Sequence, residues 1–398
     1  MTVLSIIIPA YNEEDGIEEI VNRVLCVRDP LLQVGVDTME LIVVDDGSKD
    51  ETARIIESIP GVTLVRHAKN RGYGAALKTG FNHANGDLIG FLDADGTYPP
   101  EFFPRLCEKA MNGADLVIGS RMSGEKSEMP VTRRIGNVFF AGMISLLGRQ
   151  RVTDSASGMR VFKKEILEKL YPLPDGLNLT PIMSTRAIHE GVTLIEVPIP
   201  YSERLGRSKL SVVRDGSIYL QSITWTVMTY NPVRILGMLG VLSVGFAMLV
   251  ALGLLIARAS GIDSLGPWGV MAVFAGVVAA IAGLNFYSLG VTFNYLVSMF
   301  YKQPIRQGLF GKPIFKKSID HHFWWMGGLA ILGGLILALS SLILSTNGWE
   351  MTRLWFYLLG SAMLFLVGVQ LIIYWILLRV LDDLSQREIL AAKDLQGL

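Results

Sequence analysis

Cysteine, net charge and the familiar phosphate-binding motifs are scarce or missing in this chain. The two cysteines, Cys26 and Cys107, have neither metal-binding nor redox spacing, so we expect reduced structural thiols. Lys and Arg balance Asp and Glu at 36 each, which gives no reason to expect nucleic-acid binding. Gly72 and Gly74 do not complete a G-x-G-x-x-G, and no G-x-x-x-x-G-K-[ST] occurs. A Rossmann dehydrogenase and a P-loop NTPase are therefore disfavoured.

Long apolar runs are confined to the second half of the chain. The mean hydropathy is +0.41, yet residues 1–230 carry mixed charge and are typical of a soluble domain. Four later segments reach membrane-spanning length, and they are Val233–Ile256, Val270–Phe300, Phe323–Leu344 and Leu354–Leu378. The 302–322 loop has five Lys or Arg against one Asp, which predicts that this loop and both termini are cytosolic. The first apolar run, Val3–Ile8, is too short for a signal peptide.

The first half alternates strand and helix patterns. Strands are predicted at Val3–Ile8, Glu40–Val44, Val62–Arg66 and Leu88–Leu92, and helices at Glu13–Val27, Lys49–Ser58 and Ala75–Asn85. This order predicts an α/β domain with a mostly parallel sheet and right-handed crossovers. Ligands of such sheets bind at the carboxyl ends of the strands.

Polar residues follow each of these predicted strands. Asp93 and Asp95 come directly after the fourth strand, and their i, i+2 spacing in an extended chain points both carboxylates the same way. Converging carboxylates suit a hard divalent cation, Mg²⁺ or Mn²⁺, which can hold a substrate diphosphate. Any one of these loops could be only a turn or a helix cap. The presence of all four polar loops at the same edge of the sheet predicts a nucleotide-binding site there.

Several motifs together resemble the family-two GT-A glycosyltransferases. They are Ser5-Ile6-Ile7-Ile8-Pro9-Ala10-Tyr11-Asn12-Glu13, Val43-Val44-Asp45-Asp46-Gly47-Ser48 and Asp93-Ala94-Asp95. Further signals narrow the resemblance to the polyprenyl-phosphate glycosyltransferases, and they are Gly119-Ser120-Arg121, Arg133-Arg134, the 154–160 stretch and the 204–210 stretch. The resemblance covers about residues 1–230 and implies a Rossmann-like GT-A domain.

The resemblance also implies roles for individual residues. Asp93 and Asp95 would hold the metal, with Asp93 also near the sugar and ribose, and Asp93, Asp95 and Arg121 would be catalytic. The nucleotide would contact Pro9, Tyr11, Glu13, Asp45, Asp46, Arg71 and Asp93. The diphosphate would contact Arg204 and Lys209, and the lipid phosphate would contact Arg121, Arg133 and Asn137. Two positions depart from the family pattern: Thr97 stands where many relatives have Gln, and Asn137 where many have Ser.

The residue types support these roles on physical grounds. A polyprenyl phosphate is already anionic and needs no general base, and the fork of an Arg guanidinium matches a phosphate. A divalent metal with two basic side chains can neutralise the leaving nucleoside diphosphate. Alternatively, Arg121, Arg133, Arg134 and Arg204 could simply be surface charges beside an anionic membrane.

We therefore expect four parts in the chain. Residues 1–210 would form the GT-A domain, 211–231 an interfacial amphipathic helix, 232–380 four membrane helices and 381–398 a cytosolic tail. The four helices exceed what anchoring requires, so a homo-oligomer interface or a flippase partner stays open.

The expected reaction moves one hexose from GDP-mannose or UDP-glucose to a dolichyl or undecaprenyl phosphate on the cytosolic face, with inversion. Two alternatives remain. A processive polysaccharide synthase would carry Q-x-x-R-W, whereas this chain has only Gln221-Ser222-Ile223-Thr224-Trp225. A non-enzymatic sensor that binds or scrambles lipid would not need the two aspartates.

Overall fold

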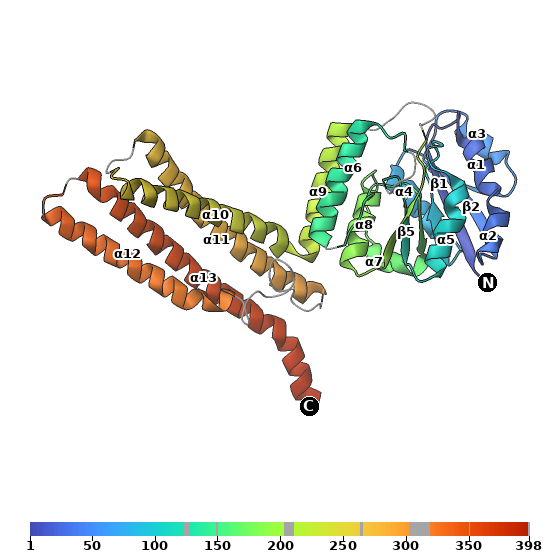
Figure 1. Cartoon of the computed structure of the whole chain (residues 1–398). Helices are drawn as coiled ribbons and strands as arrows, with labels where there is room; N and C mark the ends of the chain where they lie inside the picture. The colour runs from blue at the N-terminus through green and yellow to red at the C-terminus, as the bar shows by residue number, and fades with distance from the viewer. Residues whose placement is uncertain are drawn as a thin grey trace. The chain divides into compact units, whose positions relative to one another are not determined.

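The chain folds into two compact units, Met1–Val227 and Met228–Leu398. The computed structural model (Figure 1) describes residues 1–122, 127–148, 150–202, 211–262, 266–301, 319–349 and 351–396.

The first unit contains a seven-stranded sheet. Its strands are β1 (Val3–Ala10), β2 (Thr38–Asp45), β3 (Val62–Arg66), β4 (Leu88–Phe91), β5 (Leu116–Ser120), β6 (Arg160–Lys163) and β7 (Leu194–Pro198). They lie in the order β3-β2-β1-β4-β6-β5-β7. Only β6 runs antiparallel to its neighbours, so the predicted mostly parallel sheet is confirmed.

Helices surround this sheet and continue the chain towards the second unit. They are α1 (Ile17–Leu25), α2 (Arg28–Gln33), α3 (Thr52–Glu57), α4 (Tyr73–His83), α5 (Phe103–Met111), α6 (Val131–Gly148), α7 (Leu167–Leu170), α8 (Leu179–His189) and α9 (Val212–Tyr230), with 3-10 turns at Pro100–Phe102 and Lys164–Ile166. The helix predicted from Glu13 begins only at Ile17, because Glu13–Gly16 forms a turn in which Gly16 N–H donates to Glu13 O.

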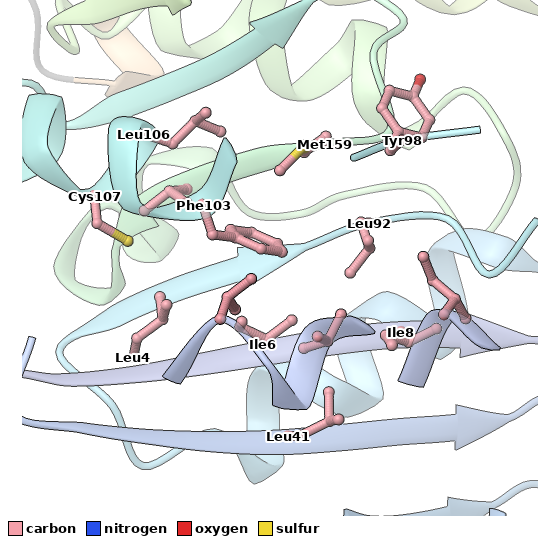
Figure 2. Close-up of a cluster of buried hydrophobic side chains, with 14 of the residues drawn as sticks. Leu4, Ile6, Ile8, Leu41, Leu92, Tyr98, Phe103, Leu106, Cys107 and Met159 are labelled. Atoms are coloured by element: carbon pink, nitrogen blue, oxygen red, sulfur yellow. The ribbon is translucent and has the colours of Figure 1, made fainter. Parts of the chain in front are cut away.

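One face of the sheet carries the main apolar core. Leu4, Ile6 and Ile8 alternate along β1 and pack against α1 and against Phe103 of α5 (Figure 2). Alternation places every second side chain of a strand on the same face. Each such side chain, fully removed from water, contributes roughly 1.5–3 kcal/mol. This core fixes the strand from which the first site loop departs.

The opposite face of β1 is covered by α4. A Cβ built on Gly80 would lie 2.4 Å from a methyl carbon of Ile7, so only glycine lets the helix approach this closely. Next to it, the ring of Phe81 meets Phe162 edge to face, with centroids 5.4 Å apart. This packing holds α4 against β1, and residues of the first turn of α4 line a cavity.

The sheet has a topological switch point between β1 and β4. From β1 the chain adds β2 and β3 on one side, whereas β4 lies on the other. Parallel sheets open a crevice at such a point, beyond the carboxyl ends of the strands. The residues that follow β1 and β4, Tyr11 and Asp93 among them, are therefore placed to face one crevice.

The second unit consists of long apolar helices. They are α10 (Pro232–Ala259), α11 (Pro267–Tyr301), α12 (Phe323–Thr346, after a 3-10 turn at Ile319–His322) and α13 (Met351–Gln396). Among the described residues, four helical segments are long and apolar enough to cross a membrane, which agrees with the four predicted spans. The α13 helix continues without a break from its apolar segment into the charged segment expected as a tail.

Glycines bring these helices together in pairs. A Cβ on Gly283 of α11 would lie 2.8 Å from the carbonyl oxygen of Gly240 in α10. A Cβ on Gly368 of α13 would lie 2.7 Å from the carbonyl oxygen of Gly327 in α12. Small residues allow close backbone approach between membrane helices, where apolar burial gives no driving force. The unit is thus built from two tightly packed hairpins.

Candidate active site

A cavity of about 500 Å³ lies at the carboxyl edge of the sheet in the first unit. Its walls come from the loops after β1, β4 and β5 and from α4, α6 and α9. The cavity brings together nine of the thirteen expected site residues, namely Pro9, Tyr11, Glu13, Asp46, Asp93, Asp95, Arg121, Arg133 and Asn137. Sequence positions more than 100 residues apart thus meet in one space.

Asp93 and Asp95 are both held by neighbouring hydroxyls. The Tyr73 hydroxyl donates to Asp93 Oδ1 at 2.7 Å. The Thr97 hydroxyl donates to Asp95 Oδ1 at 2.6 Å, and the Thr97 N–H donates to the same oxygen at 3.2 Å. Thr97, which stands where many relatives have Gln, therefore orients Asp95 in this structure.

The donor set at these two aspartates fits a divalent cation that is shared with a substrate. Mg²⁺ in phosphate-transfer sites is usually held by one or two carboxylates, with substrate phosphates and water as the other ligands. Within the described ranges, no group of three or more His, Cys, Asp or Glu side chains forms a cage of protein ligands. A cation held by Asp93 and Asp95 could take phosphate oxygens of a substrate and water as its other ligands.

Asp46 organises the loop that leads from β3 into α4. Its Oδ1 accepts the Arg71 N–H at 2.8 Å, and its Oδ2 accepts the Gly72 N–H at 2.8 Å. His67 Nδ1 lies 2.6 Å from Asp46 Oδ1, and its Nε2 lies 2.9 Å from the Thr79 hydroxyl. Asp46 therefore lines the cavity and shapes its wall at the same time.

Two expected nucleotide contacts lie outside the cavity lining. Asp45 is the last residue of β2 and is fully buried, with Oδ1 accepting the Ser48 N–H at 2.9 Å and Oδ2 lying 3.5 Å from Arg66 Nε. The Arg71 side chain is exposed, and its backbone bonds to Asp46. A second, more open hollow is lined by Tyr11, Gly47–Lys49 and Arg66–Asn70, and it shares Tyr11 and Asn70 with the main cavity.

Arg121 is fixed by a buried carboxylate. Its Nε and one terminal nitrogen both donate to Asp154 at 2.7 Å, and its guanidinium lies 5.6 Å from the Tyr98 ring and 5.3 Å from the Tyr201 ring. Burial alone would lower the pKa of Arg121, but the charge and hydrogen bonds of Asp154, together with Tyr98 and Tyr201, outweigh burial and raise this pKa above its usual range. The Arg121 guanidinium thus stays protonated at the cavity wall, where Asp154 pairs with it and fixes its orientation.

Arg133 and Asn137 lie one helical turn apart on α6, and both line the cavity. Asn137 is 6% exposed, and its amide nitrogen donates to Thr153 O at 3.2 Å. Its Oδ1 has no hydrogen-bond partner among the described residues. The two expected diphosphate contacts, Arg204 and Lys209, lie outside the described residues.

The sequence reasoning missed several residues of the site. Tyr73, Tyr98, Tyr201 and Tyr219 line the cavity with aromatic rings, and Asp215 and Gly216 of α9 complete one wall. Sequence position was the only signal that could have pointed to two of them, because Tyr73 stands between Gly72 and Gly74 and Tyr98 directly follows Thr97. The predicted interfacial helix thus also contributes directly to the cavity.

The buried Arg160, which holds the 155–158 loop by hydrogen bonds to its backbone, was also not predicted. Its Nε and one terminal nitrogen donate to the carbonyl oxygens of Ser157 and Ser155, at 3.1 and 2.7 Å. Burial lowers the pKa of Arg160 to about 10. The Gly158 N–H in the same loop donates to the Tyr98 hydroxyl at 2.7 Å. This loop therefore connects the Arg121 side of the cavity to the Asp93 side.

Comparisons with known proteins match both halves of the chain. Residues 5–171 match the family model described as glycosyl transferase family 2, and residues 232–392 match a domain of unknown function, DUF8752. The undecaprenyl-phosphate 4-deoxy-4-formamido-L-arabinose transferase of Edwardsiella ictaluri is 31% identical over 305 residues, which span 74% of this chain and 88% of that protein. The enzyme of the same name from Klebsiella pneumoniae is 30% identical over 301 residues, with the same coverage.

One similar solved structure is the glucosyl-3-phosphoglycerate synthase of Mycobacterium tuberculosis, determined with Mn²⁺, UDP and glucosyl-3-phosphoglycerate. The match covers 57% of this chain and 80% of that chain, with 24% sequence identity and a TM-score of 0.45. The sequence matches are the stronger finding. They show that this chain, an enzyme with a GT-A domain followed by four membrane-type helices, belongs to the family-two polyprenyl-phosphate glycosyltransferases.

Proposed function

We propose that this enzyme transfers one sugar from a nucleoside-diphosphate sugar to a polyprenyl phosphate and inverts the anomeric configuration. The donors to consider are GDP-mannose, UDP-glucose and the nucleotide-activated form of 4-deoxy-4-formamido-L-arabinose, the sugar in the names of the relatives. The acceptor in those names, undecaprenyl phosphate, is the polyprenyl phosphate we propose here.

One observation carries this proposal. The paired carboxylates Asp93 and Asp95 line the same cavity as the cationic side chains Arg121 and Arg133. A sugar-nucleotide diphosphate needs a cation and carboxylates to hold it, whereas an anionic acceptor needs fixed positive charge. A single cavity with both features suits transfer between these two substrates.

On the donor side, Tyr11, Glu13 and Asp46 would contact the nucleoside, with Asp93 near the sugar. Asp93 and Asp95 would hold a divalent cation, Mg²⁺ or Mn²⁺, which when bound would neutralise charge on the leaving diphosphate. Arg204 and Lys209 would add to this neutralisation. The hydroxyls of Tyr73 and Thr97 donate hydrogen bonds to these two carboxylates.

On the acceptor side, Arg121, Arg133 and Asn137 would bind the phosphate. A phosphate oxygen forms a bond to the anomeric carbon while the bond from that carbon to the nucleoside diphosphate breaks. The bonding electrons leave with the diphosphate, and attack opposite to this leaving group inverts the carbon. No general base is required, because the attacking oxygen is already anionic. Asp154 prevents Arg121 from moving with the substrate.

The acceptor would reach this cavity from the membrane surface. On α6, Val131, Ile135 and Phe139 are exposed and apolar, and on α9 the same is true of Val213 and Trp225. Exposed apolar helix faces of this kind suit a lipid interface. We place this pair of helices against the cytosolic leaflet, with Arg133 near the lipid phosphate.

The test is a transfer assay with the purified full chain in detergent, undecaprenyl phosphate, Mg²⁺ or Mn²⁺, and each radiolabelled donor in turn. The expected product is a single labelled, chloroform-soluble, acid-labile lipid. Removing metal with EDTA should stop its formation, and adding Mn²⁺ back should restore it. Asp95→Asn should lower the rate about 100-fold or more, because it removes a charged ligand.

The matched control is Asp29→Asn, which neutralises an exposed aspartate in α2 away from the cavity and should keep the wild-type rate. A labelled polymer in place of a lipid-linked monosaccharide would favour the polysaccharide synthase. Binding of nucleotide and metal with no transfer from any donor would favour the sensor.

A further inference from the structure

We propose that Tyr73 is a positioning residue, which holds the carboxylate of Asp93 in the orientation needed to bind the metal and nucleoside diphosphate. The proposal rests on the proposed function for the role of Asp93, but the contact itself is independent of it. Nothing in the motifs points to Tyr73, since the tyrosine lies 20 positions before its partner in the sequence.

The first argument is the contact. The Tyr73 hydroxyl donates to Asp93 Oδ1 at 2.7 Å, a normal length for a strong bond to a charged acceptor. The backbone of Gly158 also lies close to the carboxylate, since an added Cβ would fall 2.3 Å from Asp93 Oδ2 and 2.5 Å from Asp93 Oδ1. The carboxylate thus contacts a donating hydroxyl and a close backbone, which together limit its rotation.

The second argument is that Tyr73 is itself held rigidly. The preceding residue, Gly72, has φ +106° and donates its N–H to Asp46 Oδ2. The Ala75 N–H donates to Asp175 O at 3.1 Å, and a Cβ on Gly74 would lie 2.2 Å from Pro174 O. The first turn of α4 is therefore clamped from two sides. Because the backbone that carries Tyr73 is fixed, the Tyr73 hydroxyl does not move with the Asp93 carboxylate and can hold it in one orientation.

The third argument is chemical. The Tyr73 hydroxyl carries a proton that it can donate, whereas a carboxylate oxygen can only accept, so the direction of this hydrogen bond is set by the two groups themselves. Such partners behind a metal-binding carboxylate fix its orientation, and their loss usually costs about 10- to 100-fold in metal affinity or activity.

The experiment compares Tyr73→Phe with wild type in the full chain. Tyr73→Phe keeps the ring and removes only the hydroxyl. The matched control is Tyr171→Phe, because the buried Tyr171 hydroxyl has no hydrogen-bond partner among the described residues and does not line the cavity. Binding of Mn²⁺ is measured by electron paramagnetic resonance with UDP and again with GDP, and the nucleotide giving the larger wild-type uptake is kept.

We expect Tyr73→Phe to weaken Mn²⁺ binding by about 10-fold and to lower kcat by about 10- to 100-fold, with little change in KM for the lipid acceptor. The thermal midpoint should stay within the range of the Tyr171→Phe control. Replacing Tyr73 with 4-aminophenylalanine, whose amine also donates, should restore much of the Mn²⁺ affinity.

Unchanged Mn²⁺ affinity in Tyr73→Phe would overturn the proposal, whatever the activity. Equal losses in Tyr73→Phe and in the 4-aminophenylalanine protein, accompanied by a lower thermal midpoint, would also overturn it, since they indicate a structural role. If wild type makes no glycolipid with any donor, the proposed function fails, and the Mn²⁺ titrations still decide the role of Tyr73.

Discussion

Gly158 illustrates how single positions control this site. Its backbone lies against Asp93, and its N–H donates to the Tyr98 hydroxyl, so the residue contacts both the Asp93 carboxylate and the aromatic wall. The sequence places Gly158 in a motif but gives no reason for glycine there. The structure gives the reason, because a side chain at 158 would occupy the space of the Asp93 carboxylate.

We therefore expect Gly158→Ala to lower transfer activity at least about 10-fold. The added methyl would force Asp93 or the loop to shift, and overpacking of this kind costs about 1–3 kcal/mol of stability. Activity and thermal unfolding in detergent are measured together. Gly142→Ala on the exposed side of α6 is the control, since nothing lies within 4 Å of its Cβ and it should keep activity. Full activity in Gly158→Ala would mean that the position of Asp93 is not critical.

At the scale of elements, α11 and α13 are joined by a polar contact inside an apolar environment. Gln370 Nε2 donates to Asn285 Oδ1, and the Tyr374 hydroxyl donates to the same oxygen at 2.7 Å. Asn285 lies near the middle of α11, and Gln370 near the middle of the apolar segment Tyr357–Leu384. Polar side chains at this depth are costly unless they are paired. We infer that this contact sets the register of the two helices.

A double-mutant cycle tests the contact. Asn285→Leu and Gln370→Leu should each destabilise the membrane unit by about 1 kcal/mol, and the double variant should lose less than the sum, because the Gln370–Asn285 bond is lost in both single variants. The measurement is unfolding in mixed detergent. Thr292→Ala, which removes a bond within α11 alone, is the control and should show no coupling to Gln370→Leu. Strictly additive losses would contradict the inference.

At the scale of the whole molecule, the chain combines a water-soluble enzyme unit with a membrane unit. The proposed donor is soluble and the proposed acceptor is a lipid, so the two units correspond to the two substrate phases. This division predicts that the first unit faces the cytosol, where nucleotide sugars are made.

The two cysteines allow that orientation to be measured without mutation. Cys26 is exposed, whereas Cys107 is buried, and burial raises the pKa of the Cys107 thiol to about 12. A membrane-impermeant maleimide should therefore label Cys26 alone, in inside-out vesicles but not in intact cells. Denaturation, which exposes Cys107, should add a second labelled thiol. Labelling of intact cells would place the enzyme unit outside and contradict the proposed orientation.

Features that depend on neighbouring residues could be predicted from the sequence, whereas contacts between remote residues could not. The strands around Ile6 and the membrane helices were predicted because their patterns are local. The meeting of Asp93, Arg121 and Arg133 could be expected only through the resemblance to known enzymes. The contact of Asp93 with Tyr73 could not be predicted, because no local pattern relates a helix start to the end of another strand.

The sequence by itself determined the class of this protein: a parallel α/β domain with two carboxylates after a strand, followed by four apolar helices. Local periodicity and hydropathy suffice for that, since each depends on neighbouring residues. Only the tertiary structure decided that Asp46 organises a loop, that Asp154 fixes Arg121, and that α9 closes the cavity. Those roles depend on distances between remote segments, which are set when the core packs.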